Sequence, residues 1–165
     1  MNRIARDLGY DVLATGHNLD DEAAVLFGNT LQWSPDYLLR QGPVLASKEG
    51  LARKVKPLCR FYEREMTAYS IARGIEYIYE ECPFAEGATQ IFYKETLNQL
   101  ENTRPGIKLT FYLRFLEARQ GGELFIQREE AQLHIHPCEK CGQPTSAPGL
   151  CSFCRMLEKA DIATG

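Results

Sequence analysis

Four cysteines near the end of the chain have the spacing of a metal site. They form two pairs with two residues between the partners, Cys138 with Cys141 and Cys151 with Cys154. Each pair can bring two sulfur atoms to one ion, and the nine residues between the pairs contain prolines and glycine, which let the chain loop back. Four thiolates close the shell of Zn²⁺ and leave no position for a substrate, so the expected zinc is structural.

Two other interpretations of these cysteines are a pair of disulfides and a redox pair, and both fit an unsecreted chain poorly. His134 and His136 lie close enough in sequence to replace a cysteine, but four thiolates already fill the shell, so we expect both histidines to be strand residues. Gly142 directly follows the first pair, where a metal-binding turn favours a positive φ.

Polar side chains near the start of the chain follow an apolar segment at residues 10–14, which is typical of a strand leading into a helix. Gly16 would let the backbone approach a ligand closely. Asn18 and Asp20 are natural helix N-caps, and Asp21 suits the first turn of a helix. A capped turn explains everything except the crowding of two carboxylates beside His17 at a strand end, so a cap and a ligand site both stay open from spacing alone.

The composition sets limits on the class of protein. A chain of 165 residues with 44% apolar content suits one domain with a small appendage. No run of about 18 apolar residues and no basic-then-apolar leader is present, so we expect a soluble, cytoplasmic protein without a membrane partner. The net charge of −3 argues against binding nucleic acid by bulk charge and leaves room for a local basic face.

Apolar periodicity and Gly/Pro positions predict an α/β fold with a parallel sheet, because strands and helices alternate along the chain. The predicted strands are 10–14, 54–58, 76–79, 124–128 and 132–136. The predicted helices are 1–8, 20–31, 35–39, 60–73, 89–102 and 107–118, and residues 41–52 are expected to form a loop. The glycine pair at residues 121 and 122 divides a main domain, 1–120, from a zinc-ribbon module, 121–165.

The stretch Thr15-Gly16-His17-Asn18-Leu19-Asp20-Asp21-Glu22-Ala23 resembles the second signature of the PP-loop ATP pyrophosphatase superfamily, in its branch of TtuA/Ncs6-type tRNA 2-thiolation enzymes. The resemblance implies a partial Rossmann-like PP-loop sheet (adenine nucleotide alpha hydrolase-like). It also implies that ATP adenylates the uridine C2 oxygen and that sulfur then displaces AMP. Residues expected to contact ATP and Mg²⁺ are Gly16, His17, Asp20 and Asp21, with Asp21 as the catalytic carboxylate.

Cys82-Pro83, followed by Gly87-Ala88-Thr89 and Tyr93-Lys94, extends the same resemblance. It implies that Cys82 is the third thiolate of a [4Fe–4S] cluster whose open iron can hold the sulfur to be delivered. The other two thiolates, the phosphate loop and a further zinc finger are absent from this sequence. We therefore expect the chain to be the C-terminal half of such an enzyme and to be inactive alone, and we expect Cys59 to be structural.

Basic residues outnumber acidic ones between residues 48 and 64, and in isolation such a run indicates a solvated surface. With a tRNA-modifying family in view, five of them become candidates for phosphate contacts: Arg53, Lys54, Lys56, Arg60 and Arg64. A second set could extend this face: Arg104, Lys108, Arg114 and Arg119. The aromatic residues Phe111, Tyr112 and Phe115 are expected to pack in the core rather than to stack on bases.

The resemblance also implies partners: tRNA, a sulfur donor such as a ubiquitin-like thiocarboxylate carrier protein, the missing N-terminal half, and a second copy in a homodimer. Three alternatives stay open. The chain could be a non-catalytic zinc-ribbon module that binds RNA or protein, one half of a split thiolation enzyme, or a member of the group that thiolates the wobble uridine.

Overall fold

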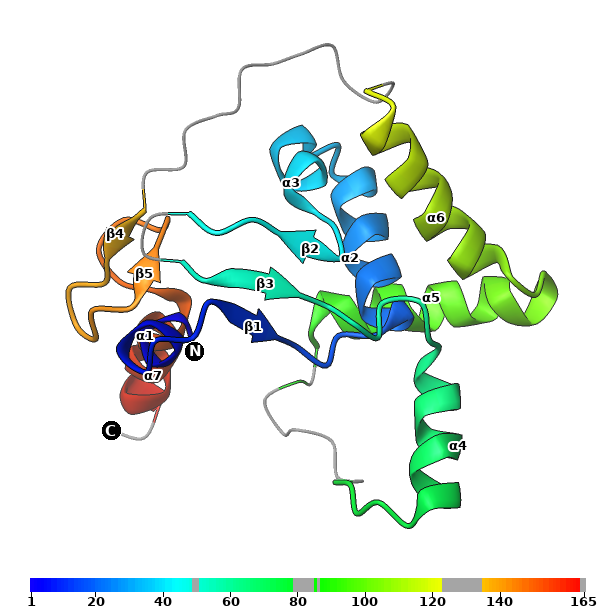
Figure 1. The fold of residues 1–165 in the computed structure, drawn as a ribbon, viewed down its shortest axis with the longest axis horizontal. Helices are drawn as coiled ribbons and strands as arrows, with labels where there is room; N and C mark the ends of the chain where they lie inside the picture. The colour runs from blue at the N-terminus through cyan, green and yellow to red at the C-terminus, as the bar shows by residue number, and fades with distance from the viewer. Residues whose placement is uncertain (49–50, 79–84, 86, 123–134, 164–165) are drawn as a thin grey trace. The chain divides into compact units, whose positions relative to one another are not determined.

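The computed structural model describes residues 1–48, 51–78, 85, 87–122 and 135–163 (Figure 1). The chain divides into two compact units, which are described separately. The sheet unit contains Met1–Ala14, Val44–Val55 and Glu129–Gly165, and the helical unit contains Thr15–Pro43 and Lys56–Arg128. In the described part of the chain, no helix is both long and apolar enough to cross a bilayer.

The helices and strands follow one another in this order: α1 (Asn2–Asp7), β1 (Val12–Ala14), α2 (Leu19–Leu31), α3 (Pro35–Arg40), β2 (Val44–Leu45), β3 (Arg53–Val55), α4 (Glu63–Arg73), α5 (Thr89–Thr103), α6 (Ile107–Gln120), β4 (His136–Pro137), β5 (Pro144–Thr145) and α7 (Ser152–Ala163). The six helices predicted before residue 120 are confirmed, with ends that shift by a few residues. Helix α7 was not predicted.

The three-stranded sheet of the sheet unit is mixed rather than parallel. Strands β1 and β3 pair in parallel, with Val12 opposite Arg53, whereas β2 pairs antiparallel with β3, with Val44 opposite Val55. The parallel pair confirms the α/β expectation. The expectation of a parallel sheet is met in part: β1 and β3 are parallel, and the antiparallel β2 lies inside the stretch predicted as a loop. Too few residues separate β2 from β3 for a parallel crossover, so the chain returns antiparallel.

The predicted strand at 76–79 is not found in its described part, because residues 76–78 have no regular structure. Residue 79 lies outside the described residues, as do the predicted strand at 124–128 and Cys82. The division into domains at residue 120 stays a prediction.

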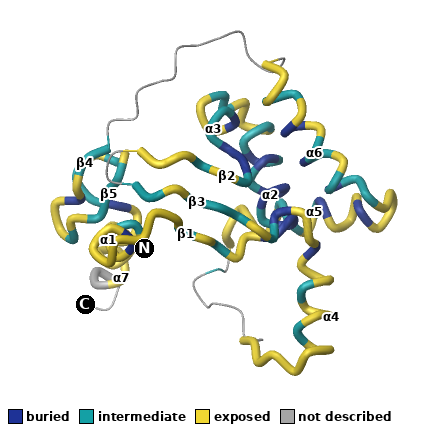
Figure 2. The backbone as a smooth tube through the Cα atoms, in the orientation of Figure 1, coloured by how far each residue is buried: buried dark blue, intermediate teal, exposed yellow. Residues whose placement is uncertain are grey.

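The core of the helical unit forms where α2 packs against α5 and α6. One cluster joins Leu19 and Leu26 of α2 to Tyr112 and Phe115 of α6. A second cluster packs Ala23 and Ala24 of α2 against Leu97 of α5. The dark blue segments of the tube in Figure 2 mark these buried positions. The aromatic residues of α6 are core residues, as predicted.

A glycine lets α2 and α5 approach each other closely. A Cβ atom built on Gly28 would lie 2.6 Å from Cε2 of Tyr93, closer than any real contact of this kind. The ring of Tyr93 in turn makes an edge-to-face contact with Phe27, with the ring centroids 5.7 Å apart. The small residue in the middle of α2 is therefore required by the packing of α5 against it.

In the sheet unit, β4 and β5 form a short antiparallel hairpin, with His136 opposite Thr145. His136 is a strand residue, as predicted, and His134 lies outside the described residues. Gly142 has a φ of 68°, which confirms the predicted left-handed turn after the first cysteine pair.

Candidate metal centre and candidate nucleotide site

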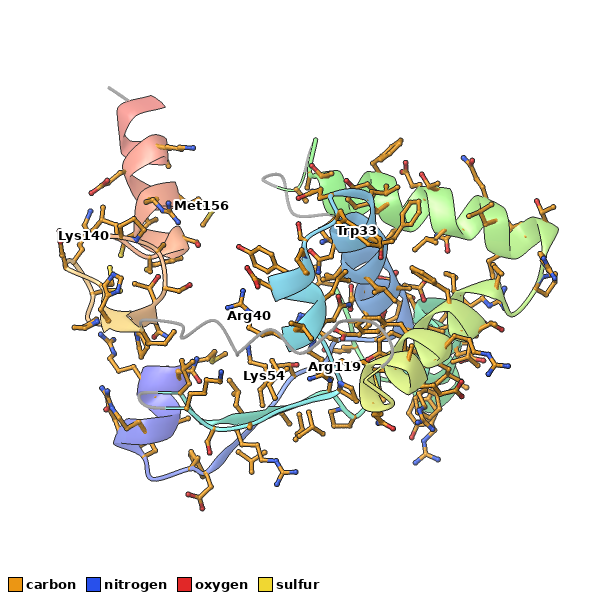
Figure 3. All side chains as sticks on the ribbon, turned by 90° about the horizontal axis from the view of Figure 1, so that it is seen from above. Trp33, Arg40, Lys54, Arg119, Lys140 and Met156 are labelled. Carbon is orange, nitrogen blue, oxygen red and sulfur yellow. The ribbon has the colours of Figure 1, made fainter. Side chains whose placement is uncertain are left out.

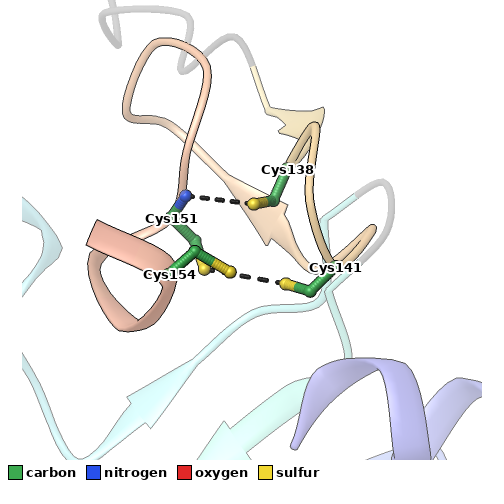
Figure 4. Close-up of side chains that lie close together, drawn as sticks. All are labelled: Cys138, Cys141, Cys151 and Cys154. Carbon is green, nitrogen blue, oxygen red and sulfur yellow. Dashed lines mark hydrogen bonds between the residues drawn. The ribbon is translucent and has the colours of Figure 1, made fainter. Parts of the chain in front are cut away.

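The sulfur atoms of Cys138, Cys141, Cys151 and Cys154, here called the sulfur cluster, all lie within 4.8 Å of one another (Figure 4). The Sγ atoms of Cys141 and Cys151 are 3.7 Å apart. Sulfurs at about 2.3 Å from a tetrahedral Zn²⁺ are about 3.8 Å apart, whereas a disulfide needs about 2.05 Å. All four cysteines are free thiols. The sulfur cluster is therefore a metal-binding arrangement.

Backbone hydrogen bonds hold the sulfur cluster in place. The N–H of Gly142 donates to the carbonyl of Cys138 (2.9 Å) and closes the turn between the first two ligands. The N–H of Cys151 donates to Sγ of Cys138 (3.2 Å), which ties the second pair to the first. The guanidinium of Arg3 in α1 donates to the carbonyl of Cys141 (2.7 Å), so the first helix of the chain supports the metal site.

The thiols differ strongly in acidity. Backbone N–H groups of Cys151 and Cys141 donate to the sulfur of Cys138 and lower its pKa to about 6. Burial and neighbouring sulfur atoms raise the pKa of Cys154 to about 12. One thiolate therefore forms easily, and the last one needs a cation to stabilise it. A shell of four cysteines with three of them buried leaves no open position, which fits a structural ion.

The N-terminus of α2 carries the second group of interest, and Asn18 caps this helix as predicted. The N–H of Asp21 donates to Oδ1 of Asn18 (3.0 Å), and the N–H of Asn18 donates to Oδ2 of Asp21 (3.0 Å). This reciprocal pair of bonds is a capping box. Asp21 therefore has a structural role through one oxygen, and its other oxygen faces a different partner.

That partner is Lys94 of α5, whose Nζ lies 2.7 Å from Oδ1 of Asp21 and 3.4 Å from Oε2 of Glu63. Partial burial alone would lower the pKa of Lys94, but Asp21 outweighs this effect and the pKa is raised. The Asp21 and Lys94 side chains are 28% and 25% exposed, so solvent or a ligand reaches both. Sequence analysis identified Lys94 only as part of a motif and did not indicate this ion pair.

His17 and Gly16 precede this charge pair, and both are exposed. The Nδ1 atom of His17 forms a hydrogen bond with the hydroxyl of Thr15 (2.9 Å). A Cβ built on Gly16 would meet no atom within 4 Å, and the φ of Gly16 is not positive. The packing and backbone of the chain therefore do not require glycine at this position.

Asp20 is buried, and both oxygens of its carboxylate have partners within the chain. Its Oδ1 is 2.5 Å from Nζ of Lys108, and its Oδ2 accepts a hydrogen bond from the N–H of Glu63 (2.8 Å). Lys108 also donates to Oδ1 of Asn98 (2.6 Å). The expectation that Lys108 belongs to a basic face is wrong, since it is 3% exposed. It lies four residues before the buried Tyr112, and this helical spacing was a signal for an inward side chain.

The five candidate tRNA contacts fall in both units. Arg53 and Lys54 belong to the sheet unit, and the others belong to the helical unit. Figure 3 labels Lys54. Lys56 is paired with the buried Glu22, at 2.7 Å from Oε1, and its side chain is only 13% exposed. Arg60 and Arg64 are exposed, and Arg64 lies over the ring of Tyr62, 4.9 Å from its centroid.

The described residues offer no second thiolate for an iron–sulfur cluster at Cys82. Cys59 is buried in the core of the helical unit, which fits its expected structural role, and the other four described cysteines form the sulfur cluster. A cluster held by Cys82 therefore needs thiolates from outside the described part of this chain.

No family model matches the chain. Among curated proteins, it is 51% identical over 158 residues to a "tRNA-5-methyluridine(54) 2-sulfurtransferase" of Thermus thermophilus. It is 45% identical over 156 residues to a protein of the same name from Pyrococcus horikoshii. These matches cover 96% and 94% of the chain but 48% and 49% of the relatives, so the chain spans about half of their length.

A solved structure, the "U34-tRNA thiolase NcsA from Methanococcus maripaludis with its [4Fe-4S] cluster", has the same fold, with a TM-score of 0.67. At 22% identity, the match covers 96% of this chain and 48% of the other. The chain thus has the fold of about half of that solved chain. Over nearly its whole length the chain is therefore similar to tRNA-5-methyluridine(54) 2-sulfurtransferases, of whose length it spans about half.

Proposed function

We propose that this chain is one half of a tRNA uridine 2-sulfurtransferase. The observation that supports this proposal is the 51% identity with the Thermus thermophilus relative over nearly the whole chain. In the proposed reaction, the uridine C2 oxygen attacks the α-phosphorus of ATP and pyrophosphate leaves. Sulfur then attacks C2 and AMP leaves. Because the chain spans half of its relatives, we expect no turnover from it alone.

Asp21 is the proposed catalytic carboxylate. It lies at the N-terminus of α2, where backbone N–H groups favour an anionic ligand, and it is partly exposed. A carboxylate in this place can hold Mg²⁺ against phosphates or orient the uridine. Gly16 and His17 are the proposed neighbours of the nucleotide, and the open space around Gly16 suits close approach of a phosphate. Asp20 would act by fixing α2, since its carboxylate is occupied by Lys108 and Glu63.

The sulfur cluster is proposed to hold one structural Zn²⁺, for which its four-thiolate donor set and closed shell are suited. Reduced thiols persist in the cytoplasm, where we propose that the protein acts. Cys82 is proposed as one thiolate of a [4Fe–4S] cluster completed by the other half, and such a cluster would supply an iron that binds the sulfur to be transferred. A thiocarboxylate carrier protein remains the proposed sulfur donor.

The experiment joins the chain to the half that it does not span. The chain and the unmatched half of the Thermus thermophilus relative are purified separately and mixed with tRNA, ATP and sulfide. We expect 2-thiouridine, measured by mass spectrometry of digested tRNA, only in the mixture. Asp21→Asn should reduce the product at least 100-fold, whereas the exposed control Glu117→Gln should not. Turnover by the chain alone would contradict the missing-half argument, and a mixture without product would contradict the function.

A second candidate is a non-catalytic zinc-ribbon module that binds RNA or protein, and half-length coverage of the relatives is the observation that favours it. The mixture separates the candidates, because a binding module would retain tRNA without modifying it. The position of the new thiouridine in the tRNA distinguishes the T-loop from the wobble position.

A further inference from the structure

Helix α4 carries an apolar groove that the rest of the helical unit does not fill. The groove, of about 850 Å³, is here called the α4 groove. Most of its lining is apolar or aromatic: Leu58, Phe61, Tyr62, Met66, Tyr69 and Leu109. Arg60, Glu65 and Ser70 complete the lining. Phe61 is 53% exposed and Tyr69 is 59% exposed. An apolar groove with aromatic walls is typical of a surface that another polypeptide covers.

Among the described residues, the hydrogen bond and the ion pair that link α4 to other elements of the helical unit lie at its first residue, Glu63. The N–H of Glu63 donates to Asp20, and the N–H of Tyr62 donates to Oε2 of Glu65 (2.9 Å). None of the eleven residues of α4, all of which are described, is buried. Figure 2 shows the helix as almost continuously exposed. A helix of this length is marginal without packing along one face, so α4 needs a further surface.

The comparisons indicate which polypeptide supplies that surface. The fold of this chain occurs within a solved chain of which it covers 48%, and the curated relatives extend to about twice its length. We propose that the α4 groove is the docking surface for the half of the enzyme that this chain does not span, which inserts apolar side chains between α4 and the start of α6. This inference rests on the proposed function and names the surface through which the two halves combine.

Two exposed tyrosines give a matched pair of variants. Tyr69 lies in the α4 groove, and Tyr37 lies in α3. They are 59% and 63% exposed, and each has an arginine over its ring, Arg73 at 6.0 Å and Arg40 at 5.2 Å. Tyr69→Asp and Tyr37→Asp therefore make the same chemical change at similar exposure. Neither tyrosine is buried, so both variants should keep the thermal unfolding profile of the parent chain.

In the test, each form of the chain is co-expressed with the unmatched half of the Thermus thermophilus relative. The two polypeptides are then separated, and the affinity of the chain for that half is measured. We expect the parent chain and Tyr37→Asp to bind this half equally well. Tyr69→Asp should bind at least tenfold more weakly, because complex formation would remove a charged carboxylate from water in a groove lined mainly by apolar side chains, and the apolar ring would be lost. Met66→Asp, from the same groove, should have the same effect.

Equal affinity of the Tyr69→Asp and Tyr37→Asp variants would overturn the proposal, and so would a parent chain that does not bind the supplied half. A parent chain that forms dimers, with Tyr69→Asp making it a monomer, would replace the proposed partner by a second copy of this chain. The thiolation assay distinguishes failure of this inference from failure of the proposed function. Binding that depends on Tyr69 without 2-thiouridine would contradict the function alone, and thiolation that is insensitive to Tyr69→Asp would contradict the docking surface alone.

Discussion

Two regions of this molecule gather acidic groups and neutralise them in different ways. In the helical unit, the buried carboxylates of Asp20 and Glu22 each meet a lysine from a distant part of the chain, Lys108 and Lys56. In the sheet unit, the sulfur cluster receives backbone N–H groups, and the described contacts include no lysine or arginine side chain on a sulfur atom. The helical unit therefore carries its own balancing cations, whereas the sulfur cluster must obtain one from solution.

Removing the metal should have the largest effect. We expect Cys154→Ser, or a chelator, to abolish protection from hydrogen exchange over residues 135–163, while α2, α5 and α6 stay protected. Structural zinc sites in small peptides bind with roughly 10–16 kcal/mol, and little other core is available there. The matched control is Glu158→Gln, which removes only an exposed ion pair with Lys140 (labelled in Figure 3) and should retain about one zinc per chain by metal analysis. If residues 135–163 of the metal-free protein stayed fully protected from hydrogen exchange, the sulfur cluster would not need a cation from solution, and the contrast with the helical unit would be wrong.

Lys108→Met should have the next largest effect, because it leaves Asp20 buried without its cation. Breaking one side of a buried pair costs about 3–5 kcal/mol, and urea unfolding followed by circular dichroism measures the loss. The control Arg114→Ala breaks an ion pair whose side chains are 78% and 62% exposed, and it should cost less than about 1 kcal/mol. Similar losses for the two variants would mean that the buried lysine is not what stabilises the helical unit.

Acid should weaken the helical unit through Glu101 of α5. Burial alone would raise the pKa of Glu101, but backbone N–H groups of Lys108 and Gly106 outweigh it and lower the pKa below its ordinary value of 4.5. The stabilisation is therefore complete above that value and is lost as the pH falls through the lower, folded-state pKa. We expect Glu101→Gln to flatten the decline in melting temperature below pH 4.5. An unchanged slope would show that other carboxylates govern the acid response.

Lys94→Met should have the smallest effect on stability. Its ion pair with Asp21 is partly exposed, so we expect a loss of about 1 kcal/mol or less in the same urea experiment. A small loss would mean that this pair contributes little to folding and stays available to a ligand. A loss as large as that of Lys108→Met would instead place Asp21 among the buried charges that hold the helices together.

The features that the sequence predicted correctly are local. The capping of α2 by Asn18 depends on residues three positions apart, and the sulfur cluster on cysteines three positions apart within each pair. Spacing of this kind is visible in a single sequence. The helices were found for the same reason, since their apolar periodicity repeats within each turn.

The features that the sequence missed depend on distant residues or on very short elements. Lys108 looks like a surface cation until Asp20, 88 positions away, is placed beside it. Strand β2 has only two residues, too few for an alternating pattern. Helix α7 was overlooked, although Phe153, Met156 and Leu157 have helical spacing.

The hydrogen bond from Arg3 to Cys141 has a consequence for how the protein is made. The two residues are 138 positions apart, so the donor leaves the ribosome on the order of ten seconds before its acceptor at typical elongation rates. The helical unit has all of its residues before the last cysteine pair is synthesised. During biosynthesis the helical unit should therefore be completed early and the sheet unit late. Helix α1 can make its hydrogen bond to the metal site only after the C-terminal cysteines have been synthesised.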